Sequence, residues 1–141
     1  MKLKFVDTNI FLRHLTNDEP VQAGACFELF KKADRDEVAL TTSESVLAEV
    51  VYLLSSRAVY NLPPETIKAM LYQLISLKGF KLGNKRLYLR ALDLYGMYKF
   101  DFEDCLSIAH MEEQNLEEIY SYDQDFDRIG NVKRMEPRRQ G

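Results

Sequence analysis

The sequence predicts an α/β protein in which a mostly parallel sheet is covered by helices on both faces. Short apolar runs typical of buried strands alternate with segments of helical periodicity along the whole chain. No tight hairpin signal joins consecutive strands, so each connection is long enough to cross over a sheet. Strands joined by helical crossovers lie parallel, and the expected architecture is a three-layer α/β/α sandwich.

The opening stretch predicts the first strand and a functional edge. Residues 3–6 form a mainly apolar run that ends abruptly at Asp7. A charged group that closes an apolar strand costs stability unless something pairs with it. In sheets covered on both faces, ligands bind outside the carboxyl ends of the strands, where Asp7 is expected to lie.

The chain from residue 10 to residue 75 is expected to be mainly helical. Pro20 and Pro64 occupy first-turn positions, and apolar residues recur at helical spacing after each of them. Residues 38–40 are apolar and bounded by Thr41 and Thr42, which indicates a strand. The expected elements are a helical turn at 10–15, helices at 20–33, 44–56 and 64–75, and the strand at 38–40.

The remainder of the chain repeats this alternation. Gly79 ends one helix and a weak strand follows it, while an acidic segment, residues 101–104, opens a later helix. A strand that includes Ile119 runs straight into Asp123. The expected elements are strands at 80–82, 118–122 and 131–133, and helices at 85–98 and 105–114.

Length and composition fit one soluble domain. At 141 residues, 46% hydrophobic and 29% charged, the chain is expected to form a single domain over residues 1–141, with 134–141 as a flexible tail. Cys26 and Cys105 lie alone in helical patterns, so we expect reduced core thiols and a cytoplasmic location. No run of about eighteen apolar residues occurs, and no membrane partner is expected.

Four acids stand out by position: Asp7, Glu49, Asp104 and Asp123. Because parallel strands end at one edge, Asp7 and Asp123 are expected to share it. Clustered carboxylates repel one another, and a cation such as Mg²⁺ or Mn²⁺ relieves the repulsion. The chemistry indicated is metal-assisted phosphoryl transfer to water.

Structural interpretations of the same acids remain open. Asp101 suits an N-cap, with Asp104 favouring the helix dipole. Asp123 suits a cap of the turn that carries Asp125, and Glu49 suits a helix surface.

The net charge of −3 does not exclude a nucleic-acid partner, because basic residues cluster locally. Each cluster suits either a phosphate contact or a solvated face. The three clusters are Lys31, Lys32 and Arg35; Lys81, Lys85, Arg86 and Arg90; and Lys133, Arg134, Arg138 and Arg139.

Four segments in this order resemble the PIN-domain nucleases, and in detail the VapC-type toxins of prokaryotic toxin–antitoxin pairs. They are residues 5–9, 46–54, 100–109 and 121–126. The resemblance implies a five-stranded parallel sheet, endoribonuclease activity on RNA, a homodimer, and a small antitoxin whose C-terminal segment enters the site. The implied residues are Asp7, Glu49, Asp104 and Asp123 as ligands of Mg²⁺ or Mn²⁺, Thr8, Asn9 and Ser121 in support, and Asp101 and Asp125 as auxiliary acids.

The leading hypothesis is therefore a metal-dependent endoribonuclease that leaves 5′-phosphate and 3′-hydroxyl ends. A haloacid-dehalogenase-like phosphatase also places an acid after its first strand, but it needs a second Asp where this chain has Asn9. A non-catalytic RNA-binding or assembly module with the same fold is the other alternative. Loss of one or more acids is its usual mark, and all four are present here.

Overall fold

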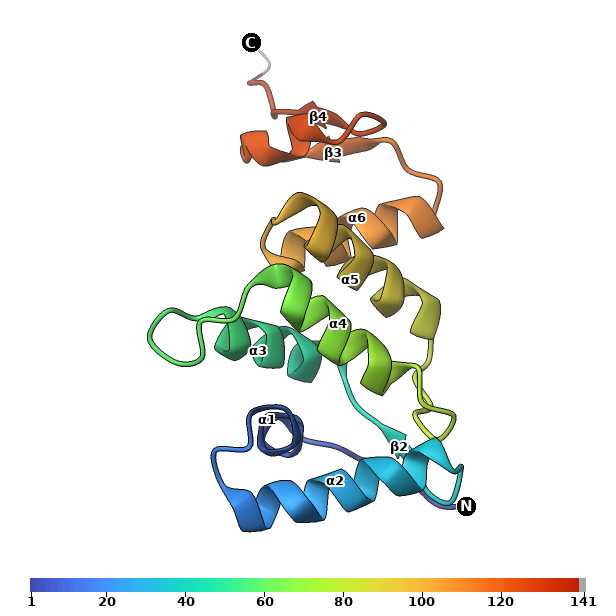
Figure 1. The fold of residues 1–141 in the computed structure, drawn as a ribbon. Helices are drawn as coiled ribbons and strands as arrows, with labels where there is room; N and C mark the ends of the chain where they lie inside the picture. The colour runs from blue at the N-terminus through green and yellow to red at the C-terminus, as the bar shows by residue number, and fades with distance from the viewer. Residues whose placement is uncertain (140–141) are drawn as a thin grey trace.

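The computed structural model describes residues 1–139, in which helices pack mainly on one another and two short pairs of parallel strands lie at opposite ends (Figure 1). This mixture confirms the α/β class. The elements are β1 (Leu3–Phe5), α1 (Thr8–Thr16), α2 (Pro20–Asp34), β2 (Ala39–Thr41), α3 (Glu44–Ser55), α4 (Pro64–Ile75), α5 (Lys85–Tyr98), α6 (Phe102–Glu113), β3 (Glu118–Tyr120), the 3₁₀ helix η1 (Gln124–Arg128) and β4 (Lys133–Met135).

The helices form where capping and proline signals predicted them. Pro20 and Pro64 occupy the first turns of α2 and α4, and the Ser43 hydroxyl accepts a hydrogen bond from the Val46 N–H at the start of α3 (3.2 Å). The predicted turn at 10–15 is a full helix, which ends at Asn17 in the left-handed conformation. No helix in residues 1–139 is long and apolar enough to span a membrane.

The predicted five-stranded sheet is wrong. β1 pairs with β2 in parallel, with Leu3 opposite Ala39, and β3 pairs with β4 in parallel, with Glu118 opposite Lys133. The predicted strand at 80–82 contributes a single bridge between Phe80 and Leu40. The described residues therefore form two separate two-stranded sheets.

The physical reason lies in the shortness of the strands. Each spans three residues and offers few ladder hydrogen bonds, so the packing of the connecting helices decides which strands meet. The last strand, Lys133–Met135, begins two residues later than predicted and includes two residues of the predicted tail. Gln140 and Gly141, at the end of that tail, lie outside the described residues.

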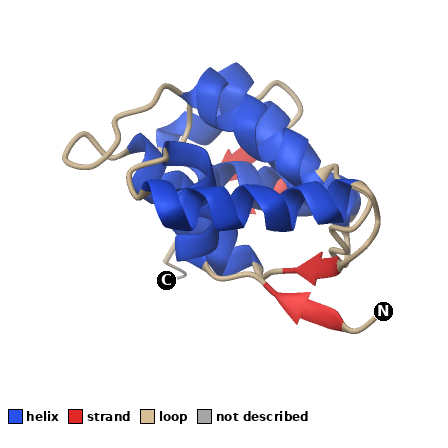
Figure 2. Cartoon of the chain, turned by 60° about the horizontal axis from the view of Figure 1, so that its bottom comes forward, coloured by secondary structure: helices blue, strands red, loops and turns tan. Residues whose placement is uncertain are grey.

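The core is continuous and mainly helical, so the predicted three-layer sandwich is also wrong. Fully buried side chains from successive elements include Phe11, Leu40, Leu54, Ile67 and Ile108. The β1–β2 pair lies at the margin of the helical body (Figure 2), and every residue of β1 is exposed. One edge of the N-terminal sheet therefore faces solvent.

Both cysteines are free and buried, which confirms the predicted reduced core thiols. Burial raises the pKa of the Cys105 thiol to about 12, with smaller contributions from Asp104 and Asp101. A thiol with this pKa is almost entirely protonated at neutral pH and is a poor nucleophile.

Candidate active site

The first group of predicted site residues joins the start of α1 to α3. Val6 is buried, Asp7 is exposed at the N-cap position of α1, and its backbone is extended (φ −89°, ψ 168°). Thr8, only 6% exposed, donates a hydrogen bond from Oγ1 to Glu49 Oε2 (3.0 Å). The buried hydroxyl thus fixes the Glu49 carboxylate beside the segment that carries Asp7. Asn9, also expected to support the site, is exposed in the first turn of α1.

The second group surrounds the first turn of α6. Asp101 is the N-cap residue of this helix, but its side chain accepts no capping hydrogen bond. Burial is the largest cause that raises the pKa of the half-buried Asp104 carboxyl. The negative charges of Asp123, Asp101 and Asp125 raise it further. Four of the predicted acids therefore lie close enough for their charges to interact: Asp101, Asp104, Asp123 and Asp125.

Ser121 and Asp123 shape the turn that follows β3. The Ser121 hydroxyl accepts a hydrogen bond from the Asp123 N–H (3.0 Å), and Asp123 Oδ1 accepts one from the Asp125 N–H (2.9 Å). Asp123 is thus the N-cap of η1, the structural role considered from the sequence. A capping carboxylate keeps further lone pairs for a ligand, so this role does not exclude the functional one.

None of these acids forms an ion pair in residues 1–139. Basic side chains pair instead with acids elsewhere, as in Lys68–Asp93 (3.3 Å) and Arg90–Glu112 (2.8 Å). The three basic clusters are partly neutralised in the same way, through Arg35–Glu37, Lys81–Asp36, Arg90–Glu112, Arg134–Asp127 and Arg134–Glu136. Among the described residues, the acids of both groups therefore have no basic side chain within ion-pairing distance, and even Lys99, near Asp101, pairs with Glu65 instead (3.4 Å).

The two groups are not joined within one chain. In the described part of the chain, no three His, Cys, Asp or Glu side chains lie close enough together to hold a metal ion. Asp7 follows β1 at one end of the molecule, Glu49 is on α3 nearer the middle, and Asp123 follows β3 at the other end (Figure 1). The prediction that Asp7 and Asp123 share one edge is therefore wrong for a single chain. The carboxylates have the right chemistry for a hard cation, but their arrangement in a single chain does not fit one. The assignment of the four acids as metal ligands remains a prediction.

A pocket of about 450 Å³ lies between α3 and the N-terminal turn of α6, beside Asp101. Tyr52, which is 69% exposed, and Lys99 line it. Lys99 adopts a left-handed backbone at the end of α5 (φ 59°). Neither residue was predicted as functional, because an aromatic residue and a lysine separated by more than forty positions give no sequence signal of their proximity.

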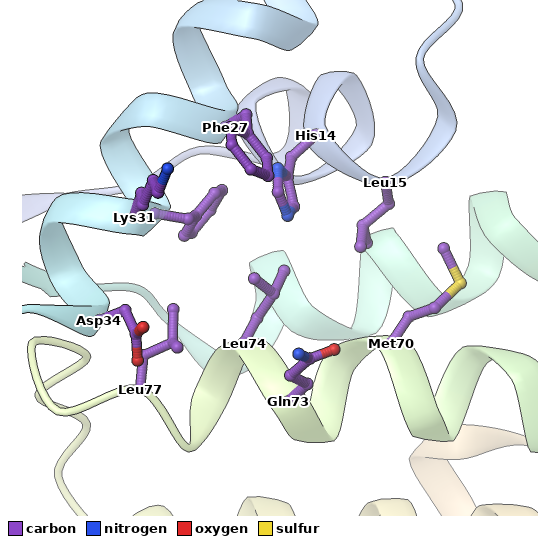
Figure 3. Close-up of a pocket in the computed structure, with 10 residues that line it drawn as sticks. His14, Leu15, Phe27, Lys31, Asp34, Met70, Gln73, Leu74 and Leu77 are labelled. Carbon is purple, nitrogen blue, oxygen red and sulfur yellow. The ribbon is translucent and has the colours of Figure 1, made fainter.

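A second pocket, of about 460 Å³, lies away from the acids between α1, α2 and α4 (Figure 3). The His14 ring lies 4.8 Å from the Phe30 ring and 6.0 Å from the Phe27 ring, between centroids. Burial lowers the pKa of His14, and its Nδ1 is buried without a hydrogen-bond partner among the described residues. His14 therefore packs against the two phenylalanine rings.

Comparison with known proteins places the site in a family. The PIN domain model matches residues 4–132, which include all the predicted site residues. The comparison with curated proteins finds no match. Since the matched segment spans most of the chain, the protein belongs to the PIN domain family.

Proposed function

We propose that the protein is a divalent-metal-dependent endoribonuclease of the VapC type, the toxin of a toxin–antitoxin pair. PIN domains are generally nucleases, so hydrolysis of nucleic acid follows from the family. The choice of RNA, the metal and the toxin role rest on the four sequence motifs described above. We propose Asp7, Glu49, Asp104 and Asp123 as the metal ligands, with Mg²⁺ or Mn²⁺ as the metal.

The observation that carries this proposal is the uncompensated negative charge beside the strand ends. The first group leaves the Asp7 and Glu49 carboxylates without an ion pair in residues 1–139, and the second raises the pKa of Asp104 through neighbouring carboxylates. Natural proteins retain such repulsion mainly where a ligand relieves it. Hard divalent cations that also bind phosphate are the ligands this chemistry suits.

The pocket beside Asp101 supports RNA as the substrate. Exposed Tyr52 offers a face on which an unpaired base can stack, and Lys99 supplies a positive charge for the phosphodiester. Both side chains line the pocket together with Asp101 and Glu103 of the acidic turn of α6, and Lys99 also pairs with Glu65 (3.4 Å). A single-stranded segment would thus be held with its backbone close to the carboxylates.

The partner proposals follow from the same resemblance. We propose a homodimer and a small antitoxin protein as the inhibitor, whose C-terminal segment enters the acidic site. A cytoplasmic location fits two buried, reduced thiols.

Cleavage of single-stranded RNA by the wild type and by Asp7→Asn tests the activity. With Mg²⁺ or Mn²⁺ the wild type should cut and EDTA should stop it, while Asp7→Asn should be slower by about 100-fold or more because a ligand is lost. Asp34→Asn, an exposed acid on α2, is the matched control and should retain wild-type activity. Cleavage in EDTA, or an Asp7→Asn protein as active as the control, would refute the proposal.

One observation favours the alternative of a non-catalytic RNA-binding module. In residues 1–139 of a single chain the acids remain in two groups. Such a module would bind RNA in EDTA and cleave nothing in either metal. A gel-shift assay run beside the cleavage assay separates the two functions.

A further inference from the structure

Arg128, the last residue of η1, connects the two segments of the chain that carry the second group of acids, Asp101, Asp104, Asp123 and Asp125. Its guanidinium carbon Cζ lies 4.7 Å from the centroid of the Phe100 ring, and its Nη2 donates a hydrogen bond to the Tyr98 carbonyl oxygen (3.4 Å). Phe100 is buried and directly precedes Asp101. The Arg128 side chain therefore reaches from η1 to the connection between α5 and α6.

Arg128 lies beside acids of η1 but pairs with none of them. In a 3₁₀ helix, side chains three positions apart lie on the same face, so Arg128 shares a face of η1 with Asp125. Asp127 pairs instead with Arg134 (3.1 Å), and among residues 1–139 Arg128 forms no ion pair. The guanidinium group is thus held by an aromatic ring and a backbone carbonyl, although carboxylates lie nearby.

This arrangement leaves the charge and most hydrogen-bond donors of Arg128 available to a ligand. A guanidinium group carries five N–H donors and, in the described residues, only the hydrogen bond to Tyr98 uses one. The Phe100 ring holds the cation through its negative face but offers no oxygen to the other donors. Because Arg128 is exposed, an anion from solvent can accept two parallel hydrogen bonds from its planar edge.

A phosphodiester of a nucleic acid is the anion that suits this position. Its two non-bridging oxygens match the fork of an arginine, and proteins of this family generally act on nucleic acid. The second group of acids repels a negatively charged substrate, so a cation beside them is needed to bring a phosphate close. Lys99, on the same connection as Phe100, pairs with Glu65 (3.4 Å), which leaves Arg128 better suited to this role.

We propose that Arg128 binds a phosphate of the RNA substrate that flanks the cleaved bond, through two hydrogen bonds from its guanidinium group to the non-bridging oxygens. Phe100 is then a positioning residue, because it fixes the guanidinium group and does not touch the phosphate. The inference rests on the proposed function for RNA as the substrate. It assigns a role to a residue that lies outside the four resembling segments and the three basic clusters.

A purely structural role makes different predictions, since the same contacts also tie η1 to the end of α5. Arg128→Met retains an unbranched side chain that can pack on Phe100, but it removes the charge and the donors. Arg128→Lys retains the charge without the fork. If the contacts only stabilise the fold, Arg128→Met would lower the melting temperature and leave the KM for RNA unchanged.

Cleavage kinetics with Mn²⁺ and a single-stranded RNA oligonucleotide provide the first test. A contact made equally in the ground state and the transition state changes KM and not kcat. Arg128→Met should therefore raise KM by about 10-fold with kcat nearly unchanged, and Arg128→Lys should lie between it and the wild type. The matched control is Arg57→Met, at an exposed arginine between α3 and α4, and it should keep the wild-type KM.

Neutral phosphate analogues identify the contact itself. In a set of oligonucleotides, an uncharged methylphosphonate replaces one flanking phosphate at a time. For the wild type, KM should rise by about 10-fold at one position, and Arg128→Met should show no further rise there, because the contact is already lost. Differential scanning calorimetry checks that the variant is folded. If Arg128→Met does not fold, Arg128→Lys, with a weaker response at that position, provides the comparison.

Each other result overturns the inference. A KM of Arg128→Met equal to that of Arg57→Met would show that Arg128 does not bind the substrate. A lower melting temperature for Arg128→Met with the wild-type methylphosphonate profile would assign it a structural role alone. A wild type that cleaves no RNA with Mg²⁺ or Mn²⁺ would refute the proposed function, and the inference with it, whereas an active wild type limits any failure to Arg128.

Discussion

Gly79, which follows α4 along the chain, packs against α2 and β2 at a place with no room for a side chain. Its N–H donates to the Ala33 carbonyl oxygen (2.8 Å) and its carbonyl accepts from the Leu40 N–H (2.7 Å). A Cβ here would lie 2.8 Å from the Ala33 oxygen and closer still to the Val38 carbonyl oxygen. Only the absence of a side chain allows this close approach of three segments.

Gly79→Ala should therefore lower the free energy of unfolding by about 1–3 kcal/mol, because backbone atoms must move to admit the methyl group. Gly83→Ala is the control, since a Cβ at that position meets nothing within 4 Å. Urea unfolding followed by circular dichroism measures both. Equal stability of the two variants would contradict the close approach.

The acids of the candidate site could be named from the sequence, but their arrangement could not, because Asp7 and Asp123, expected at one edge, follow strands of two separate sheets. Asp7 follows an apolar strand, and that position alone predicted an exposed carboxylate that needs a polar or charged partner. The link from Thr8 to Glu49 was not visible, because it joins positions 41 residues apart through one hydroxyl. The position of an acid in the sequence shows that it follows a strand, but it does not show which hydroxyl group will form a hydrogen bond with it.

At the scale of the element, the first turn of α6 is where burial and charge repulsion most clearly disfavour the folded state. The pKa of Asp104 is raised above its ordinary value of 3.8 by burial and by neighbouring carboxylates. Folding is therefore less favourable when Asp104 is ionised. That cost is fully present above the folded pKa, and it vanishes as the pH falls below 3.8.

Asp104→Asn should therefore raise the melting temperature at pH 7 in the presence of EDTA, and the gain should shrink as the pH approaches 4. Glu103→Gln removes a charge from the same turn at an exposed position and should give a smaller gain. Differential scanning calorimetry at several pH values provides the measurement. A lower melting temperature for Asp104→Asn at pH 7 would show that the helix dipole outweighs the repulsion.

The helices were predicted more accurately than the strands. Proline and cap signals fixed the starts of α2 and α4, because these signals act within one turn. The strands were located near their observed positions, but Phe80 forms only a bridge and the last strand is displaced. A three-residue strand depends on a partner far along the chain, and that partner is not encoded locally.

At the scale of the whole molecule, one core connects the two sheets. Buried hydrophobic residues form a single cluster that extends from Val6 to Ile129. Cys105 on α6 belongs to this cluster, and Cys26 is buried on α2, so the two thiols are natural probes of two separate helices. Proteins with one core of this size usually unfold in a single cooperative step.

Both thiols should accordingly become reactive over the same range of denaturant concentration. Brief pulses of an alkylating reagent, followed by mass spectrometry of the Cys26 and Cys105 peptides, measure each one separately. Pulses in buffer alone, where both are buried, and in high denaturant set the limits. Exposure of Cys26 at clearly lower denaturant than Cys105 would show that the molecule consists of two unfolding units.

The exposed edge of β1 has a consequence during synthesis of the chain. β1 leaves the ribosome before the elements that follow it, so at about 5–20 residues per second its edge stays bare for roughly 6 to 23 s before β3 is made. A bare apolar edge during that interval invites association with other nascent chains. Lys2 and Lys4 place the same charge on every copy of this segment. Neighbouring nascent chains on one messenger therefore repel at the place where they would otherwise aggregate.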